Sequence, residues 1–167
     1  VIDLYIWFRW TPEATLEDYK PLDSFEITNG RIDNKFSIVE KTIGNVKYVS
    51  ARVLATISEP WRLKAFPFDR HLIAVHIEDG GHVLSEVVFE PDRDNSRVSD
   101  EVRISGWSLS GFKTSVADHI YASNYGDISL ANDAQSAYSR FTMTMELNRD
   151  GIGFSLKVLW LVFLGTL

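Results

Sequence analysis

The chain has 167 residues, of which 45% are hydrophobic, with no cysteine and a formal net charge of −6. This length and hydrophobic content predict one domain with a sizeable core. The lack of cysteine excludes thiol catalysis, cysteine-bound zinc and a disulfide framework. The acidic balance disfavours nucleic acid and anionic membrane surfaces as partners, because both reward basic patches, and it favours cations.

The chain opens on a predicted strand, because its side chains alternate in character. The hydrophobic face is formed by Leu4, Ile6, Phe8 and Trp10. The other face is polar and aromatic and is formed by Asp3, Tyr5, Trp7 and Arg9. No basic stretch followed by a hydrophobic run precedes this strand. We therefore expect the chain to start inside a domain, with an N-terminal strand missing.

Short alternating or apolar runs separated by turn signals continue along the chain. The runs cover residues 25–27, 36–40, 46–57, 72–77, 83–89, 102–112, 117–122 and 141–147. The turn signals are Asn29-Gly30, Gly44-Asn45, Gly80-Gly81, Pro91-Asp92 and residues 148–151. This spacing predicts an all-β fold, an immunoglobulin-like antiparallel β-sandwich. One short helix is predicted near the N-terminus, at Pro12–Tyr19, with Thr11 as its N-cap.

The last segment, Phe154–Leu167, is almost wholly apolar and does not alternate. It is shorter than the roughly 20 residues that span a bilayer. We interpret it as the truncated start of a transmembrane helix, with a buried C-terminal helix as the alternative. The predicted division is therefore a β-sandwich over residues 1–150 and the start of a membrane helix over residues 151–167.

Enzymatic motifs are absent from the sequence. It has no Ser-His-Asp order, no nucleotide-binding glycine-rich loop and no HExxH motif, so we expect no enzyme and no cofactor. A transition-metal site at His76, Glu78 and His82 is conceivable, but a simple tight turn is favoured there.

The segment Asp92–Ser96 has oxygen donors at alternate positions, as a calcium loop does. Arg97 stands where the sharp turn needs glycine, and Arg103 where a bidentate glutamate is needed. A solvated loop is therefore favoured. A weak calcium site at Asp92, Asp94 and Asp100, with calcium as a modulator, stays an alternative.

The segment Phe66-Pro67-Phe68-Asp69 forms a bend between two predicted strands. Pro67 fixes its own φ and pushes Phe66 into an extended conformation, so both aromatic rings project from a rigid turn. This segment resembles a loop of the pentameric ligand-gated ion channels, the Cys-loop receptor superfamily, where it leans on the membrane domain. For these four residues alone, an ordinary hairpin containing proline is the alternative.

The similarity to the bacterial, cysteine-free branch of this family extends from Tyr5 to the end of the chain. Residues 5–10, 19–26, 46–56, 78–80 and 121–140 resemble the segments that carry loops D, A, E, B and C of the family's ligand site. The resemblance implies a ligand site formed by Tyr5, Trp7, Glu26, Thr28, Ser50, Glu78, Tyr121 and Tyr138. Tyr19 stands where the family usually has tryptophan, and Gly80 replaces an aromatic residue usual in loop B.

An amine is the ligand that the resemblance favours. Glu26 and Glu78 would supply negative charge, and the aromatic side chains would supply faces for cation–π contact. The alternative for Tyr5 or Trp7 is that its ring only packs the sandwich.

The resemblance also implies a coupling element formed by Phe66, Pro67, Phe68, Asp69 and Arg149. Arg149 resembles the arginine that precedes the family's first membrane helix, and Asp69 is its natural partner. Gly151 stands where relatives have proline, and Lys157 is unusual so early in a membrane helix.

The function implied is that of the extracellular ligand-binding and gating domain of a homopentameric cation channel. The channel would lie in a bacterial inner membrane, with this domain on the extracellular or periplasmic side and the C-terminal helix against the lipid bilayer. The main alternative is a soluble oligomeric ligand-binding protein of the same fold without a pore. A carbohydrate-binding or hydrolytic sandwich is a further alternative, but no pair of carboxylates at a defined spacing supports it.

Overall fold

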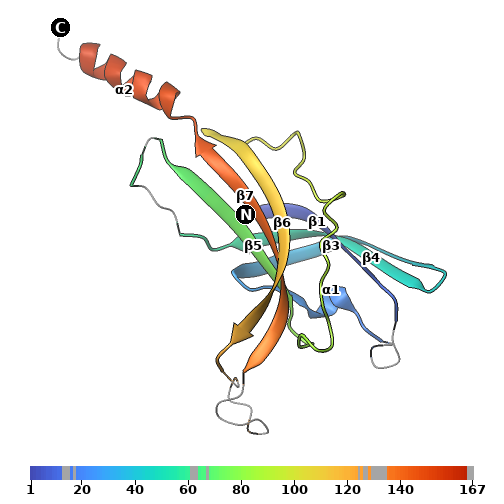
Figure 1. The fold of residues 1–167 in the computed structure, drawn as a ribbon. Coiled ribbons are helices and arrows are strands. Elements are labelled where there is room, and N and C mark those ends of the chain that lie inside the picture. The colour runs from blue at the N-terminus through green and yellow to red at the C-terminus, as the bar shows by residue number, and fades with distance from the viewer. Residues whose placement is uncertain are drawn as a thin grey trace. The chain divides into compact units, whose positions relative to one another are not determined.

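The computed structural model describes residues 1–12, 16, 18–60, 64–66, 68–123, 125, 128 and 135–164. Its elements in chain order are β1 (Ile2–Trp10), α1 (Pro21–Ser24), β2 (Phe25–Ile27), β3 (Gly30–Ile43), β4 (Val46–Ile57), β5 (Arg70–Asp79), β6 (Trp107–Tyr121), β7 (Ser136–Arg149) and α2 (Gly151–Leu164) (Figure 1).

The strands form two sheets, which confirms the all-β prediction. One sheet has the order β1-β4-β3 and the other has the order β2-β5-β7-β6. The β1–β4, β3–β4 and β2–β5 pairings are antiparallel. The β3–β4 hairpin closes at Gly44, whose φ of +61° is a conformation that glycine adopts without strain, as the turn signal predicted.

The chain divides into two compact units, each described by itself. The first contains residues 1–58, 75–90 and 116–142. Its core uses the alternation of β4, where Val49, Ala51, Val53 and Ala55 are all buried. The Phe8 ring of β1 lies 5.6 Å from the Phe25 ring of β2, so residues of the two sheets pack on each other inside this unit.

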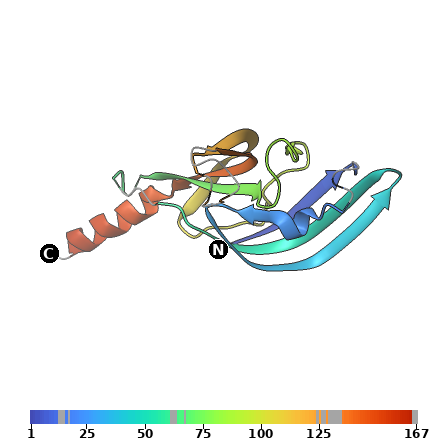
Figure 2. The same ribbon diagram turned by 90° about the horizontal axis from the view of Figure 1, so that it is seen from below.

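The short helix α1 precedes β2 in the first unit and lies beside the sheet of β1, β4 and β3 (Figure 2). Pro21 starts it and is buried with Leu22. The Lys35 ammonium of β3 donates a hydrogen bond to the Leu22 carbonyl and lies 4.3 Å from the centre of the Phe25 ring. Burial lowers the pKa of Lys35. These contacts hold α1 and β2 in place.

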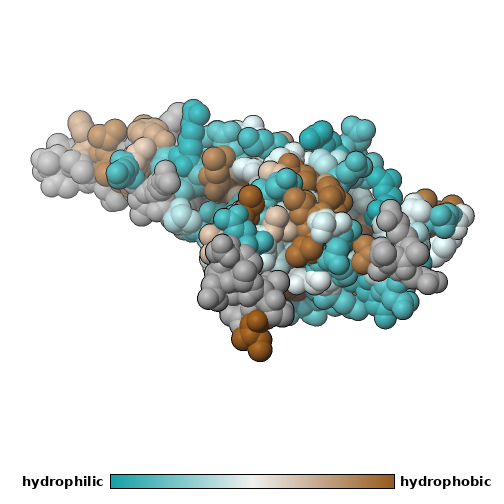
Figure 3. All heavy atoms as spheres, turned by 60° about the horizontal axis from the view of Figure 1, so that its bottom comes forward, coloured by the Kyte–Doolittle hydropathy of each residue, from teal (hydrophilic) through white to brown (hydrophobic). Residues whose placement is uncertain are grey.

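The second unit contains residues 59–74, 91–115 and 143–167. Leu147 near the end of β7 is its most buried large side chain among the described residues, at 1% exposure. The helix α2 exposes a series of large apolar side chains, and Figure 3 shows hydrophobic atoms over it. They are Leu156, Val158, Leu159, Trp160, Phe163 and Leu164. Among the described residues no helix reaches the length and hydrophobicity that a membrane crossing requires.

Three details of the predicted secondary structure are wrong. The helix lies at Pro21–Ser24, whereas the described residues Pro12, Leu16, Asp18 and Tyr19 are not helical; the rest of the predicted helix lies outside the described residues. Residues 83–89 form no strand. Their backbone bonds instead include Leu84 N–H to the Ala137 carbonyl and Phe89 N–H to the Ser139 hydroxyl, so no continuous ladder develops. The two runs at 102–112 and 117–122 belong to one strand, β6, which begins only at Trp107 after the Ile104 turn.

Candidate functional site

The predicted ligand-binding residues all belong to the first unit, where they form two groups. Tyr5, Trp7 and Ser50 lie on the β1-β4-β3 sheet, with Trp7 directly opposite Ser50. The second group lies on or next to the β2-β5-β7-β6 sheet and consists of Glu26, Thr28, Glu78, Tyr121 and Tyr138.

The second group is organised around the Glu78 carboxylate, which is 1% exposed at the end of β5. Arg140 of β7 donates from Nε to Glu78 Oε1 at 2.5 Å, and the Tyr121 hydroxyl of β6 donates to Oε2 at 3.0 Å. Arg140 Nη2 also donates to the Tyr121 hydroxyl at 3.0 Å. Burial and the bond to Glu78 raise the pKa of Tyr121. The charge of Glu78 is thus neutralised inside the protein.

Tyrosine rings surround this ion pair. The Tyr121 ring lies 5.8 Å from the Tyr138 ring and 5.7 Å from the Tyr125 ring, with tilted or edge-on geometry. Tyr125 is exposed, and its backbone has a positive φ of 54°. Burial, followed by the nearby Tyr138, Glu78 and Glu26, raises the pKa of Tyr125. We call Glu26, Glu78, Tyr121, Tyr125, Tyr138 and Arg140 the Glu78 cluster.

Glu26 is the carboxylate of this cluster that faces solvent. It lies directly opposite Glu78 in the β2–β5 pairing. Side chains directly opposite each other in antiparallel strands share a face and sit about 5 Å apart, so two carboxylates there repel. Arg140 removes that repulsion by neutralising Glu78, and the net negative charge of the cluster resides on Glu26.

Gly80 leaves room for the Glu26 side chain. A Cβ atom at position 80 would lie 3.2 Å from Glu26 Cδ and 3.4 Å from the Ser24 carbonyl oxygen. The Gly80 N–H donates to that same carbonyl at 2.8 Å. A bulky side chain at this position would therefore compete with Glu26 for space.

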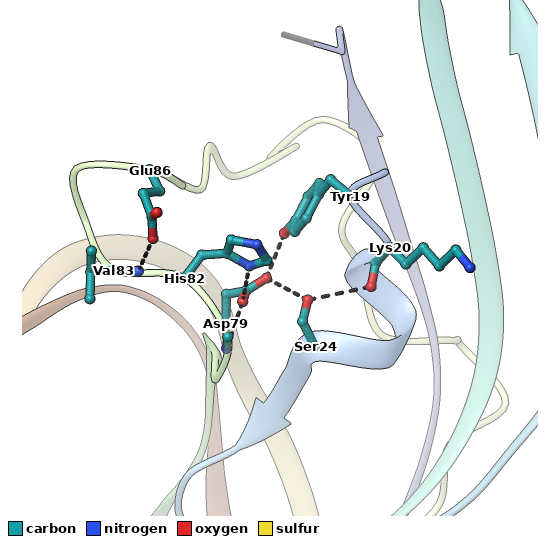
Figure 4. A network of polar contacts seen from close by, with 8 residues as sticks. Tyr19, Lys20, Ser24, Asp79, His82, Val83 and Glu86 are labelled. Atoms are coloured by element: carbon teal, nitrogen blue, oxygen red, sulfur yellow. Dashed lines mark hydrogen bonds and ion pairs between the residues drawn. The ribbon is translucent and has the colours of Figure 1, made fainter. Parts of the chain in front are cut away.

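A second polar network lies on the other side of β5 and is centred on Asp79 (Figure 4). Asp79 Oδ2 accepts from the Tyr19 hydroxyl at 2.7 Å and from the Ser24 hydroxyl at 2.6 Å. Asp79 Oδ1 accepts from Gly81 N–H at 3.0 Å and lies 2.8 Å from His82 Nδ1. Burial acts to raise the pKa of Asp79, but these hydrogen bonds outweigh it and lower the pKa. We call Tyr19, Ser24, Asp79 and His82 the Asp79 network.

The group on the β1-β4-β3 sheet centres on Arg52, which the sequence did not single out. Its guanidinium donates to both carboxylate oxygens of Asp3, at 2.8 and 2.6 Å. It also lies over the rings of Tyr5 and Phe36, its cross-strand neighbours, at 5.9 and 5.3 Å. Tyr5 is 63% exposed, which fits the predicted binding face better than core packing.

The predicted coupling residues lie in the second unit, where Asp69 and Arg149 form an ion pair. Arg149 donates from Nε to Asp69 Oδ1 at 2.6 Å and from Nη2 to Oδ2 at 3.1 Å. Asp69 is 2% exposed. The bond from Arg149 lowers the pKa of Asp69, and it outweighs the opposing effect of burial. The Phe66 ring lies 5.1 Å from the guanidinium, Phe68 is exposed, and Pro67 lies outside the described residues.

His71 and Trp107 also contact this ion pair. His71 Nε2 lies 2.7 Å from Asp69 Oδ2. The Trp107 ring lies 4.1 Å from the Arg149 guanidinium and packs edge-on against the His71 ring at 5.0 Å. Asp69, His71, Trp107 and Arg149 therefore form one compact cluster directly before α2, held by charge, hydrogen bonds and cation–π contact.

The two metal sites that the sequence left as alternatives do not assemble within the described part of the chain. No group of three or more His, Asp or Glu side chains there could hold a metal ion. Asp92 Oδ1 accepts from the Asn95 amide at 2.7 Å, and Asp92, Asp94 and Asp100 form no such group. His76 lies 3.0 Å from the Thr142 hydroxyl and His82 binds Asp79, so the suggested His76, Glu78 and His82 set does not converge either.

Sequence reasoning missed Arg140, Tyr125, Arg52 and His71. Arg140 and Arg52 lie in strands whose side chains alternate between hydrophobic and polar, and an arginine in such a strand is expected to face solvent. The contact between Arg140 and Glu78 joins positions 62 residues apart, and only the strand order brings them together. His71 offered one signal, since it stands two residues after Asp69 on the same face of an extended segment.

No protein-family model matches the chain.

Proposed function

We propose that this chain is the ligand-binding and gating domain of a pentameric, cation-conducting ligand-gated channel of the Cys-loop receptor superfamily. In this proposal the two sheets form the immunoglobulin-like sandwich of that family, and five identical chains assemble with ligand sites between them. The domain faces the outside or periplasm of a bacterial cell, and α2 continues into the first membrane-spanning helix.

The observation that carries the proposal is the buried pair of Asp69 and Arg149. A bidentate carboxylate–guanidinium pair fixes the relative position of two elements more strictly than a single hydrogen bond does. Here it ties the end of the Phe-Pro-Phe-Asp segment to the residue two places before an apolar, exposed helix. Such a joint can pass a change of shape from a binding domain to a helix in the membrane.

The ligand site of the proposal is split between two subunits. The Glu78 cluster would form one wall, and the exposed face with Tyr5, Trp7 and Ser50 would form the other wall on the neighbouring subunit. The two groups lie on different sheets of one chain, so each group can face a different neighbouring copy in this proposal.

An organic ammonium ion is the ligand that this chemistry suits. Tyr121, Tyr125 and Tyr138 offer aromatic faces, and cation–π contact contributes about 0.5–2 kcal/mol per ring. The solvent-facing Glu26 supplies the charge, because Glu78 is already paired with Arg140. Strand β5 then links the two functional groups of residues, with Asp69 directly before its first residue and Glu78 next to its last.

Two ligands of matched shape test this proposal. Choline carries a quaternary ammonium, and 3,3-dimethyl-1-butanol is its uncharged isostere. Calorimetry on the assembled gene product that contains this chain should give a dissociation constant for choline at least tenfold below that of the isostere, with up to five sites per assembly. Equal affinities, or no binding of either compound by a pentamer, would refute the ammonium site.

A further inference from the structure

The strand that carries Glu26 is weakly held by its own sheet. Strand β2 has three residues and pairs only with β5, at the edge of the β2-β5-β7-β6 sheet. Its central residue, Glu26, lies opposite Glu78 across the pair. A three-residue edge strand gains little from pairing alone, so other contacts must fix its position.

The Asp79 network supplies such contacts. Asp79 lies directly opposite Phe25 in the β2–β5 pairing. Through Oδ2 it binds the hydroxyls of Tyr19, before α1, and Ser24, the last residue of α1. Asp79 is 3% exposed, and hydrogen bonds to a buried charged group contribute more than neutral ones. The segment that leads into β2 is therefore tied to β5 at two points.

Aromatic packing positions the Tyr19 hydroxyl next to Asp79. The Tyr19 ring packs edge-on against Trp10 at 5.8 Å and against His82 at 5.0 Å. His82 Nδ1 in turn lies 2.8 Å from Asp79 Oδ1; Figure 4 marks this contact with a dashed line. The hydroxyl is thus positioned by two rings that do not depend on its own hydrogen bond.

Asp79 does not belong to the binding surface itself. Consecutive side chains of a strand point to opposite faces, so Asp79 points away from the face on which Glu78 and Glu26 lie. Its carboxylate oxygens are occupied by donors from the chain.

We infer that Asp79 is the positioning residue of the ammonium site: through Tyr19 and Ser24 it sets where β2 holds Glu26 relative to the tyrosines of the Glu78 cluster. The ligand in this inference rests on the proposed function, whereas the link from Asp79 through Tyr19 and Ser24 to β2 does not. Loosening the Asp79 network lets β2 and Glu26 shift relative to those tyrosines, which lowers ammonium affinity without removing any ligand-contacting group.

The test uses the double variant Tyr19→Phe/Ser24→Ala, which removes both donors to Oδ2 and keeps the ring that packs on Trp10 and His82. Tyr48→Phe is the control, because it removes a tyrosine hydroxyl from β4 in the same unit. Two quantities are measured on the full gene product: choline affinity, and amide hydrogen exchange in peptides covering residues 19–28 and 46–57.

We expect the double variant to weaken choline binding about tenfold, because Glu26 is then held less strictly near the tyrosines of the Glu78 cluster; tenfold corresponds to about 1.4 kcal/mol. Exchange should accelerate at least tenfold over residues 19–28 and stay unchanged over residues 46–57. Asp79→Glu should retain more affinity than Asp79→Asn, because an amide has one acceptor oxygen and turns an NH2 donor either to the two hydroxyls or to the Gly81 N–H. The control should behave as wild type.

The outcomes separate the two claims. Unchanged exchange over residues 19–28 overturns the inference, whatever choline does. Faster exchange with unchanged choline affinity also overturns it, because the network would then be a fold contact without influence on the site. If wild type does not bind choline, the ammonium proposal fails, and the exchange result alone decides whether Asp79 positions β2.

Discussion

The ion pair between Glu78 and Arg140 allows a quantitative prediction about stability. The Glu78 side chain is 2% exposed and that of Arg140 is 19% exposed. In Arg140→Met the aliphatic volume is largely kept, but the buried carboxylate retains only the Tyr121 hydroxyl as a donor. Breaking a buried pair in this way costs about 3–5 kcal/mol. The partial exposure of Arg140 places the loss in free energy of unfolding at the low end, about 3 kcal/mol.

A double-mutant cycle separates this effect from lost packing. Glu78→Gln removes the charge and keeps an oxygen acceptor, so we expect a loss of about 1 kcal/mol. Adding Glu78→Gln to Arg140→Met removes the stranded charge and should bring the total loss to about 2 kcal/mol. The coupling energy should therefore be about 2 kcal/mol, within the range seen for residues in contact.

The assay is urea unfolding followed by tryptophan fluorescence, since the chain has five tryptophans. Arg52→Met is the matched control. The side chains of Arg52 and its partner Asp3 are each 42% exposed, so this substitution should shift the urea midpoint little. A coupling energy below about 0.5 kcal/mol, or equal losses at Arg140 and Arg52, would refute the reasoning.

Three further predictions follow from the same geometry. Glu26→Gln should weaken choline binding about tenfold and Glu78→Gln much less, because Arg140 already neutralises Glu78; calorimetry should show this order, and the reverse order would contradict it. Gly80→Ala should also weaken choline binding, since its Cβ would crowd Glu26 Cδ at 3.2 Å, while the urea midpoint should change little. Asp69→Asn should destabilise the protein at pH 7. The pKa of Asp69 in the folded protein lies below its value of about 3.9 in the unfolded chain. The stability that the ion pair contributes is therefore fully present above the unfolded-state pKa, and it is lost as the pH falls through the folded-state pKa. The stability difference between wild type and Asp69→Asn should therefore not shrink between pH 8 and 5 and should shrink below pH 4, and a difference that shrinks already between pH 7 and 5 would argue against the ion pair.

Much of the fold could be predicted from hydrophobic alternation. The alternation of residues 2–10 was sufficient to predict β1, because a strand buried on one face imposes a two-residue period. Gly44 was sufficient to predict the hairpin turn, because a tight hairpin requires a residue that tolerates positive φ. The apolar run at residues 83–89 misled because it pairs with no neighbouring strand, and its hydrophobic side chains include Phe89, whose ring lies 6.1 Å from that of Phe8. Periodicity alone does not report whether a partner strand exists.

The candidate site was less predictable than the fold. Residue type pointed to the acidic and aromatic members, and the pairing of Asp69 with Arg149 was expected. The partner of Glu78 was not, because an arginine in the middle of a strand gives no local sign that it reaches a carboxylate on a neighbouring strand. That contact changes the chemistry, since it neutralises Glu78 and leaves Glu26 as the exposed carboxylate of the cluster.

The central claim is that binding at the Glu78 cluster opens a pore through the joint at Asp69 and Arg149. Current recordings from the gene product that contains this chain, with choline applied to surface-expressed protein, test it most directly. We expect a cation current in wild type that Asp69→Asn reduces strongly while choline affinity stays within about threefold. Bound choline without current in wild type, or a parallel loss of binding and current in Asp69→Asn, would contradict it.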